Sequence, residues 1–488
     1  MPGLTDRYAE LAALPFDGGY PVPETGRTLN EELFFQRAVQ TYLWSLPAIN
    51  MYAMKEGLGK TFGYGYQVMS VFEQRLKPNT IITTPNSDVI YGLGFADLSE
   101  TGPLVIEAPP RLQALLDDFW HRPLVGPKID GVQFLGDIGL PGPDRGAGGK
   151  YLIVPEGAEV DTGDDEYFVY SSPTNGVFIF LRGFFQSVDD LSPGVAAIEG
   201  ITIRPLHGDA KPMDFQHASN VDSNALFDHD ASYFDMLDAF IQSEQVDAVD
   251  PYMHGMLAAI GIAKGREFTP SDRQRELMDQ AATTAWKMAK TIAAEYDTTY
   301  KALWWEDRHW VAHVRTELDD FMHTLLDEQW RDRTTGHTDV DAKAHMFINH
   351  YSISTGMMSS IVGFGAKYGN AYKDADGNYL MGGNTYRIDL PPNAPANLFW
   401  SVTVYDAETA AGVDADGQTY PSLNSMNDLV YNDDGSVSMY IAPERPDGAG
   451  NWIKSVPGRG WFSLIRWYGP TADFFDRNYK PGDFVRIG

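Results

Sequence analysis

The chain has 488 residues, of which 67 are acidic and 37 are basic, so its formal net charge at pH 7 is −30. With 43% hydrophobic residues, a chain of this length can bury a large core, which excludes an intrinsically disordered protein. The acidic excess repels phosphate backbones, so we expect no nucleic-acid partner. The sequence contains no cysteine, which excludes disulfides, thiol nucleophiles and cysteine-ligated metals. Its apolar runs are short and interrupted, so we expect no membrane span and no membrane partner.

Residues 1–79 form a predicted N-terminal helical segment. Thr28-Leu29-Asn30-Glu31 matches a capping box, and helix-forming residues with apolar spacing follow to about Met54. Pro47 is expected to bend or divide this helix, because proline lacks an amide donor and its ring clashes with the preceding turn.

Residues 80–230 are predicted to form an N-terminal β-rich domain. Short runs of β-branched and aromatic residues are separated there by clusters of Gly, Pro, Asn and Asp, which is typical of antiparallel strands joined by turns. The predicted strands are Thr80–Thr84, Val89–Phe95, Leu104–Glu107, Tyr151–Val154, Tyr167–Ser171, Val177–Arg182 and Ile201–Arg204.

Residues 231–350 predict a helical section with several amphipathic helices, one of which begins near Thr269. Strand patterns return over residues 351–488, a predicted C-terminal β-rich domain in which Asp-Gly pairs supply favoured hairpin turns. The predicted fold class is therefore α+β, with two antiparallel β-rich domains and a helical section between them.

Several strings of residues, in a specific order, resemble those of a known family. They are Thr84–Tyr91, Gly146–Pro155, Phe399–Asp406 and Arg466–Pro470. The chain resembles a bacterial family catalogued as domain of unknown function 1254 followed by domain of unknown function 1214, here residues 80–230 and 351–488. The resemblance implies that both β-rich domains are β-sandwich-like and that the protein assembles as a homo-oligomer. It implies no particular chemistry.

The N-terminal sequence bears on the compartment. Many relatives in the family look exported, whereas this chain opens without the basic and apolar regions of a secretory signal. We expect a cytoplasmic protein if this N-terminus is complete, and a periplasmic one if a signal peptide has been removed.

Asn86, Asp88 and Tyr91 are the first candidate catalytic residues, because three polar side chains enter one predicted strand together. If they face a cavity, the carboxylate can act as a base or metal ligand and the phenol as a proton donor. Alternatively, Asn86 and Asp88 only shape a turn by bonding to nearby backbone amides.

Asp137, Lys150 and Arg182 complete the candidate catalytic set. Asp137 lies between two glycines, and a glycine cluster precedes Lys150, but a strand follows where a phosphate-binding loop needs Ser or Thr and a helix. A hairpin loop is the alternative to a site there. Lys150 and Arg182 can clamp a substrate carboxylate, or they can form structural ion pairs.

Glu306, His309 and His313 are candidate metal ligands. On a helix with about 100° per residue they share one stripe with Glu317 and Asp320, and imidazole with carboxylate suits a divalent metal. The stripe lies away from the apolar face of that helix, so a solvated helix surface is the alternative reading.

These residues favour a soluble enzyme acting on a small organic substrate, a hydrolase or lyase, with its pocket at the domain junction. The alternative is a non-catalytic protein that binds a small molecule or carbohydrate, or that assembles with itself. The cofactor is unknown. A divalent metal is possible, and the sequence has no dinucleotide fingerprint or haem motif, so we expect neither a nucleotide nor haem.

Overall fold

The computed structural model describes residues 4–163, 165–185, 189–246, 250–313, 336–358 and 360–488. Within those ranges, no helix combines the length and the apolar character that crossing a bilayer requires.

The chain divides into two compact units. The smaller unit comprises Met1–Ser45 and Asp228–Met288, and the larger unit comprises Leu46–Phe227 and Ala289–Gly488. Both β-rich domains that the sequence predicts lie in the larger unit, so their mutual contacts are contacts within one unit.

The smaller unit is mainly helical. Its elements are α1 (Leu4–Ala12), β1 (Phe16–Asp17), β2 (Tyr20–Pro21), α5 (Ser232–Ser243), α6 (Pro251–Ala259) and parts of α2 (Pro23–Phe62) and α7 (Asp272–Ala294). The ring of Tyr42 stacks on that of Tyr233, with centroids 3.9 Å apart. α2 begins at Pro23, ahead of the predicted start at Thr28, because proline is well suited to a first helical turn. The helix continues through Pro47.

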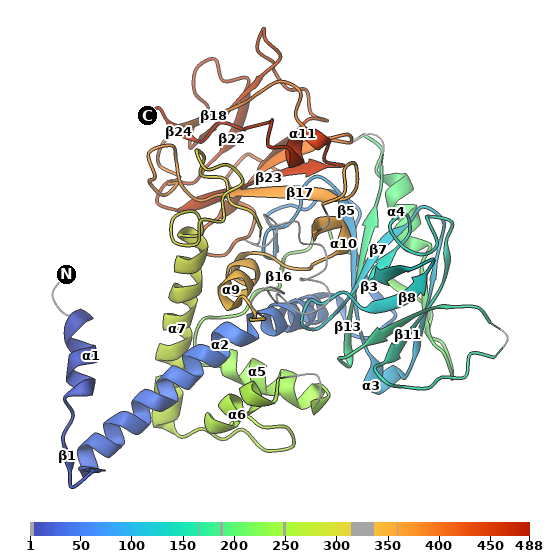
Figure 1. Ribbon diagram of the computed structural model, residues 1–488. Helices are drawn as coiled ribbons and strands as arrows, with labels where there is room; N and C mark the ends of the chain where they lie inside the picture. Colours follow the sequence, from blue (N-terminus) through green and yellow to red (C-terminus); the bar gives the residue numbers. More distant parts are fainter. Residues whose placement is uncertain (1–3, 164, 186–188, 247–249, 314–335, 359) are drawn as a thin grey trace. The chain divides into compact units, whose positions relative to one another are not determined.

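The first β-rich domain is a sandwich of two six-stranded sheets (Figure 1). One sheet has the order β10 (Asp137–Ile138), β7 (Gln113–Asp118), β13 (Gly176–Gly183), β5 (Ile90–Asp97), β3 (Val68–Phe72), β15 (Asp214–His217). The other has the order β14 (Thr202–Pro205), β6 (Leu104–Ala108), β11 (Gly149–Pro155), β12 (Phe168–Ser172), β8 (Val125–Ile129), β9 (Val132–Leu135). Most pairs are antiparallel, as expected, but β3 with β15 and β11 with β12 are parallel. Shorter elements accompany the sandwich, namely β4 (Thr80–Ile81), α3 (Leu98–Thr101), α4 (Ser192–Glu199) and β16 (Ser223–Asn224).

Side-chain alternation gives the first of these sheets an inner face that enters the core and an outer face on which Arg182 lies beside the buried rings of Phe178 and Phe180. Along β13, every second side chain enters the core between the two sheets, and these are Val177, Ile179 and Leu181. Arg182 therefore points to the outer face of the sheet. Tyr91, which is paired with Arg182 across β5, lies on the same outer face.

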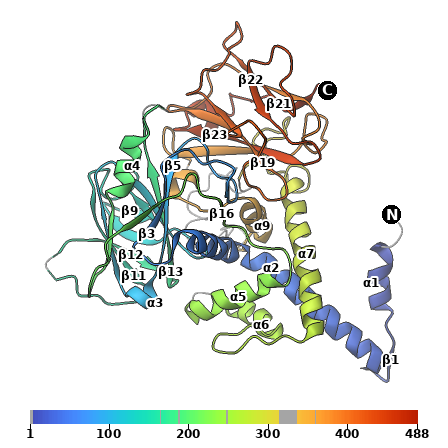
Figure 2. The ribbon, with the colours of Figure 1, turned by 180° about the vertical axis from the view of Figure 1, so that it is seen from behind.

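The second β-rich domain is also a sandwich, built from two four-stranded sheets that can be followed from behind in Figure 2. One sheet has the order β17 (Ala366–Ala371), β23 (Trp461–Tyr468), β19 (Trp400–Asp406), β20 (Ser422–Asn424). The other has the order β22 (Asn451–Lys454), β21 (Val437–Ala442), β18 (Tyr386–Leu390), β24 (Val485–Arg486), and α11 (Ala472–Phe475) lies between β23 and β24 in the chain. Only the pair of β21 and β22 is parallel within this domain as described.

Alternation along β23 again separates two faces. Trp461, Ile465 and Trp467 are buried in the core of the second sandwich. Arg466 and Tyr468 therefore point to the outer face of their sheet, away from that core.

The chain between the two sandwiches is less helical than the sequence predicts. After α7 come α9 (Val340–Asn349) and α10 (Thr355–Met358), whereas residues 301–313 contain no helix. There Val311 bridges to both Leu303 and Asn370, so the segment is held against β17 as an extended chain. The fold class is α+β, as predicted, and the helix predicted around Glu306 is wrong over residues 301–313.

Candidate functional site

The two outer faces contribute to one buried group of polar side chains inside the larger unit. We call this group the junction cluster, and it consists of Arg75, Asn86, Asp88, Tyr91, Arg182, His350, Tyr351, Tyr368, Tyr405, Arg466 and Tyr468. The guanidinium groups of Arg182 and Arg466 both act electrostatically on the hydroxyls of Tyr91 and Tyr351, which shows that the two faces meet. All members except Arg182, which is partly exposed, are buried.

Asn86 serves both as a turn residue and as a contact between the sandwiches. Its side-chain oxygen accepts a hydrogen bond from the backbone amide of Asp88 at 2.9 Å, and its amide nitrogen donates to the hydroxyl of Tyr468 at 2.5 Å. Thr84, at the start of this turn, has a positive φ of 38°. Such backbone strain in a non-glycine residue is concentrated at functional sites.

Asp88 is completely buried, and only one of its carboxylate oxygens is satisfied. Oδ1 accepts hydrogen bonds from Ser422 at 3.0 Å and Asn424 at 2.7 Å, and it pairs with the guanidinium of Arg75 at 3.3 Å. Oδ2 has no hydrogen-bond partner among the described residues. Because leaving a buried carboxylate oxygen unpaired costs free energy, this oxygen is the first candidate for a group that meets a ligand.

Arg182 and Arg466 differ in how they are held. The guanidinium of Arg466 donates to the hydroxyl of Tyr405 at 2.7 Å and that of Thr403 at 3.1 Å. Arg182 lies over the ring of Tyr91 at 5.9 Å, and its Nε has no hydrogen-bond acceptor in the described part of the chain. Neither guanidinium forms an ion pair with a described carboxylate.

Four tyrosines of the cluster remain protonated near neutral pH. Burial raises the pKa of Tyr91, Tyr351, Tyr405 and Tyr468, and the positive charge of Arg466 only partly opposes that effect. These hydroxyls are therefore available as neutral hydrogen-bond or proton donors.

His350 is a neutral member of the cluster. Burial lowers its pKa well below the usual value, and His313, whose ring centroid is 4.2 Å away, together with Arg466 adds to that effect. Nδ1 of His350 contacts the hydroxyl of Thr84 at 3.0 Å, whereas Nε2 has no partner among the described residues. A neutral imidazole with a free nitrogen can accept or relay a proton.

The structure brings together four of the six predicted catalytic residues and places the other two elsewhere in the first sandwich. Asn86, Asp88, Tyr91 and Arg182 are in the junction cluster. Lys150 is on β11 in a solvent-exposed ion pair with Asp165 at 2.9 Å. Asp137 is buried on β10, where its backbone oxygen accepts a hydrogen bond from Tyr170 at 2.8 Å.

The predicted metal ligands do not share a stripe, because the segment that carries them is not helical. Glu306 is exposed, His309 contacts Asp297 through Nδ1 at 2.9 Å, and His313 stacks on Tyr368 with centroids 4.6 Å apart. No group of three described His, Asp or Glu side chains is placed to hold a metal ion. Glu317 and Asp320 lie outside the described residues.

Sequence reasoning did not select His350, Tyr351, Arg466 or Tyr468. Arg466 could have been selected from the sequence, because it is a charged residue within the apolar strand sequence Trp461–Tyr468. His350 and Tyr351 carried none, because they follow a short helix with no distinctive spacing.

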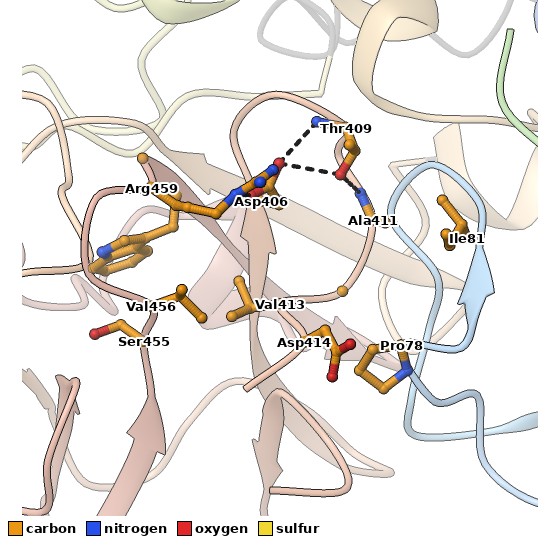
Figure 3. Close-up of a pocket in the computed structure, with 13 residues that line it drawn as sticks. Pro78, Ile81, Asp406, Thr409, Ala411, Val413, Asp414, Ser455, Val456 and Arg459 are labelled. Atoms are coloured by element: carbon orange, nitrogen blue, oxygen red, sulfur yellow. Dashed lines mark hydrogen bonds and ion pairs between the residues drawn. The ribbon is translucent and has the colours of Figure 1, made fainter. Parts of the chain in front are cut away.

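A separate cavity of about 220 Å³ lies between the second sandwich and the chain around Pro78 and Ile81 (Figure 3). Asp406 lines it, and its carboxylate accepts hydrogen bonds from the amide and hydroxyl of Thr409 at 3.0 and 3.1 Å and pairs with Arg459 at 2.5 Å. Asp406 follows Tyr405 on β19, so the two side chains point to opposite faces of the sheet. The cavity is therefore distinct from the junction cluster, and its central carboxylate is fully engaged.

Comparisons with known proteins agree with this division of the chain. Residues 67–205 match the model of a family described as protein of unknown function DUF1254, and residues 365–472 match that of DUF1214. Five cluster members (Arg75, Asn86, Asp88, Tyr91 and Arg182) lie in the first match, and four (Tyr368, Tyr405, Arg466 and Tyr468) lie in the second. No curated protein matches the chain.

Two solved structures are similar to this chain. The VPA0106 protein from Vibrio parahaemolyticus is 14% identical, with a TM-score of 0.52 over 94% of this chain and 100% of the other. An uncharacterised protein from Burkholderia cenocepacia is 12% identical, with a TM-score of 0.42 over 93% of this chain and 94% of the other. The first likeness extends over the whole α+β fold and carries no information about chemistry.

Proposed function

We propose that this chain, which belongs to the family in which a DUF1254 domain is followed by a DUF1214 domain, is an enzyme that acts on a small organic substrate at the junction cluster. The observation that carries the proposal is the unpaired Oδ2 of the completely buried Asp88, next to neutral tyrosine hydroxyls and a guanidinium without a hydrogen-bond acceptor at Nε. Unpaired polar groups of this kind destabilise the fold, and they are typical of sites that a substrate completes.

The residues of the cluster suit hydrolase or lyase chemistry. Asp88 Oδ2 would act as the general base, taking a proton from a water molecule or from a substrate carbon. The hydroxyl of Tyr91 would return a proton to the leaving group, and Arg466 would stabilise the negative charge that develops on a substrate oxygen. Burial raises the pKa of Tyr91, so its hydroxyl carries the proton that this step requires.

The proposed reaction needs a path by which a substrate reaches the junction cluster, and the partial exposure of Arg182 supports a path beside that residue. It is the partly exposed member of an otherwise buried cluster, and it lies on the outer face of its sheet. A substrate that enters beside Arg182 would reach the Tyr91 ring first, because the guanidinium lies over that ring.

The proposal is tested by screening the purified chain against nitrophenyl esters and β-hydroxy acids, and then by comparing Asp88→Asn with Asp165→Asn on the best substrate. We expect Asp88→Asn to lower kcat at least about 100-fold, as for loss of a general base. Asp165→Asn, which removes an exposed carboxylate, should leave kcat unchanged. Full activity of a folded Asp88→Asn protein would contradict the assignment.

Loss of activity in Asp88→Asn through misfolding needs to be distinguished from loss of a base. Tyr91→Phe provides the second variant, because it removes one hydroxyl and leaves the carboxylate and its ion pair with Arg75 intact. We expect Tyr91→Phe to lower kcat and to unfold at the same urea concentration as the wild type to within a few tenths of a molar unit. Unchanged kcat would exclude Tyr91 as the acid.

A second candidate function is carbohydrate binding without catalysis, at a groove of about 530 Å³ in the larger unit. Tyr64, Tyr66 and Gln67 line the groove, and the side-chain oxygen of Gln67 is buried without a partner among the described residues. Aromatic rings and a free amide oxygen suit a sugar ring and its hydroxyls. Saccharide binding that is lost in Gln67→Ala, together with no turnover on any tested substrate, would favour this function.

A further inference from the structure

We infer that the junction cluster binds an organic dianion, with one anionic group on Arg182 and the other on Arg466. This inference rests on the proposed site and names the class of ligand that the site takes. The observation behind it is the balance of buried charge in the cluster.

Three guanidinium groups and one carboxylate belong to the cluster. Arg75 is compensated, because it forms an ion pair with Asp88 at 3.3 Å and lies over the ring of Tyr420 at 4.3 Å. Arg182 and Arg466 form no ion pair with any carboxylate in the described ranges. The cluster therefore holds an excess of two positive charges.

Among the described residues, Arg466 is hydrogen-bonded only to neutral groups. Its acceptors are the hydroxyls of Thr403 and Tyr405 and the backbone oxygen of Thr84. Such bonds hold the guanidinium in place but do not neutralise it. Arg182 has even less support, because its Nε lacks any acceptor among the described residues.

The neighbouring titratable groups do not supply the missing negative charge. Burial raises the pKa of the hydroxyls of Tyr91, Tyr351, Tyr405 and Tyr468, so the tyrosines stay neutral. Burial also lowers the pKa of His313 and His350, so these histidines add no positive charge. These four hydroxyls and two imidazoles thus leave the excess of two charges unchanged, and Asp88, which also acts on Arg466, is already counted against Arg75.

An uncompensated buried guanidinium is strongly unfavourable, and a bound anion removes that penalty. Guanidinium groups bind carboxylate and phosphate oxygens through two parallel N–H donors. Both guanidiniums act electrostatically on Tyr91, Tyr351 and Tyr468, so the two positive charges belong to one group of side chains. A dicarboxylate and a phosphate both satisfy this chemistry.

The net charge of the whole chain is opposite in sign to the excess charge of the junction cluster. The formal net charge is −30, so a free anion is repelled by most of the surface at low ionic strength. Binding of a dianion must then depend on local contacts, and it should be lost when either local guanidinium is removed.

The test is isothermal titration calorimetry of the full chain at constant ionic strength with malonate, inorganic phosphate, acetate and the neutral compound malonamide. We expect malonate or phosphate to bind at least about tenfold more tightly than acetate, and malonamide not to bind. The tighter of the two dianions identifies whether the ligand is a carboxylic acid or a phosphate compound. Equal binding of acetate, or no binding of either dianion, would overturn the inference.

The site of binding is tested with Arg182→Gln and Arg466→Gln, with Arg204→Gln as the matched control. Arg204 lies on the first sandwich in a partly buried pair with Glu107. We expect each cluster variant to weaken dianion binding about tenfold or more and Arg204→Gln to leave it unchanged. If Arg466→Gln does not fold, Arg182→Gln decides the question, because Arg182, which lies over the Tyr91 ring, makes no hydrogen bond through Nε to a described residue. Unchanged binding in Arg182→Gln would overturn the inference.

This binding experiment does not depend on turnover. Dianion binding without any catalysed reaction would support the inference and contradict the proposed enzymatic function. If the chain turns over a neutral substrate, this turnover requires Asp88 and no dianion binds, the result would support the proposed enzymatic function and contradict the inference of a dianion site.

Discussion

At the scale of single residues, the site is defined by polar atoms that the fold leaves unpaired. Asp88 Oδ2, Arg182 Nε and His350 Nε2 are buried without a hydrogen-bond partner among the described residues. Each lowers the stability of the ligand-free protein, since a buried polar group loses its bonds to water and gains nothing in return. A ligand that pairs with them recovers that free energy.

Replacement of Arg182 by methionine tests this view of the residue. Met keeps most of the apolar stem and removes the uncompensated charge, so we expect the ligand-free variant to gain about 1 kcal/mol in free energy of unfolding. Dianion binding should be lost in the same protein. Urea unfolding measures the first effect, and Arg204→Met, at a partly buried ion pair near the surface, should change stability by less than about 0.5 kcal/mol. A loss of stability in Arg182→Met would show that Arg182 has a structural role.

The sequence indicated part of this site for physical reasons. Asn86, Asp88 and Tyr91 were recognisable because they occur together, and Arg182 because it ends an apolar strand. Tyr468, the partner of Asn86, is 382 residues away in the chain, and no local pattern predicts such a contact. Lys150 looked equivalent to Arg182 in sequence, yet solvent and Asp165 satisfy its charge.

At the scale of elements, the site depends on the alternation of side chains along strands that belong to two sandwiches. β13 and β23 each direct apolar side chains into a core and a guanidinium to the outer face. The same strand therefore supplies stability on one side and chemistry on the other.

Adjacent residues of β23 should consequently respond differently to substitution. Trp467 is fully buried in the core, so Trp467→Ala should lower the free energy of unfolding by about 3–5 kcal/mol. Tyr468→Phe removes only the hydroxyl that accepts from Asn86, which should cost about 1 kcal/mol. Urea titrations compare the two variants. Equal losses would contradict the assignment of opposite faces.

The sequence predicted the β-rich, helical and β-rich order of elements but not the conformation of residues 301–313. Amphipathic spacing indicated a helix around Glu306. In the structure the backbone of Val311 pairs with that of Asn370 at 2.8 and 2.9 Å, and these long-range hydrogen bonds hold the segment extended. Tertiary pairing of this kind overrides local helical preference.

At the scale of the whole molecule, buried histidines couple folding to pH. Burial lowers the pKa of His121 and His345 to about 3, and it lowers the pKa of His313 and His350 well below the usual value. The unfolded chain binds protons at these positions below about pH 6.5, and the native protein does not. Stability should therefore fall as the pH decreases through 6.5 toward 3, by up to about 1.4 kcal/mol per pH unit for each histidine.

Three acids oppose this trend, because burial raises the pKa of Asp117, Asp118 and Asp483. Burial raises the pKa of Asp117 well above its usual value, so the native protein keeps a proton that the unfolded chain releases above about pH 4. That group alone would make stability fall as the pH rises. Four strongly shifted histidines outnumber these three carboxyl groups, so the net effect remains a loss of stability on acidification.

Urea unfolding at pH 7 and pH 5 measures the pH dependence. We expect a smaller free energy of unfolding at pH 5, a shallower pH dependence in His345→Gln, and no change of slope in His207→Gln, where the histidine is exposed. Equal stability of the wild type at the two pH values would mean that the buried histidines are protonated in the native protein.

The most direct test of the central claim is the inhibition of turnover by malonate, measured on the best substrate of the screen. If the anion site and the catalytic site are the same junction cluster, malonate will raise KM and leave kcat unchanged, and Arg182→Gln will abolish this inhibition. Malonate that lowers kcat without affecting KM, or that leaves both constants unchanged while it binds, would show that the two sites are separate.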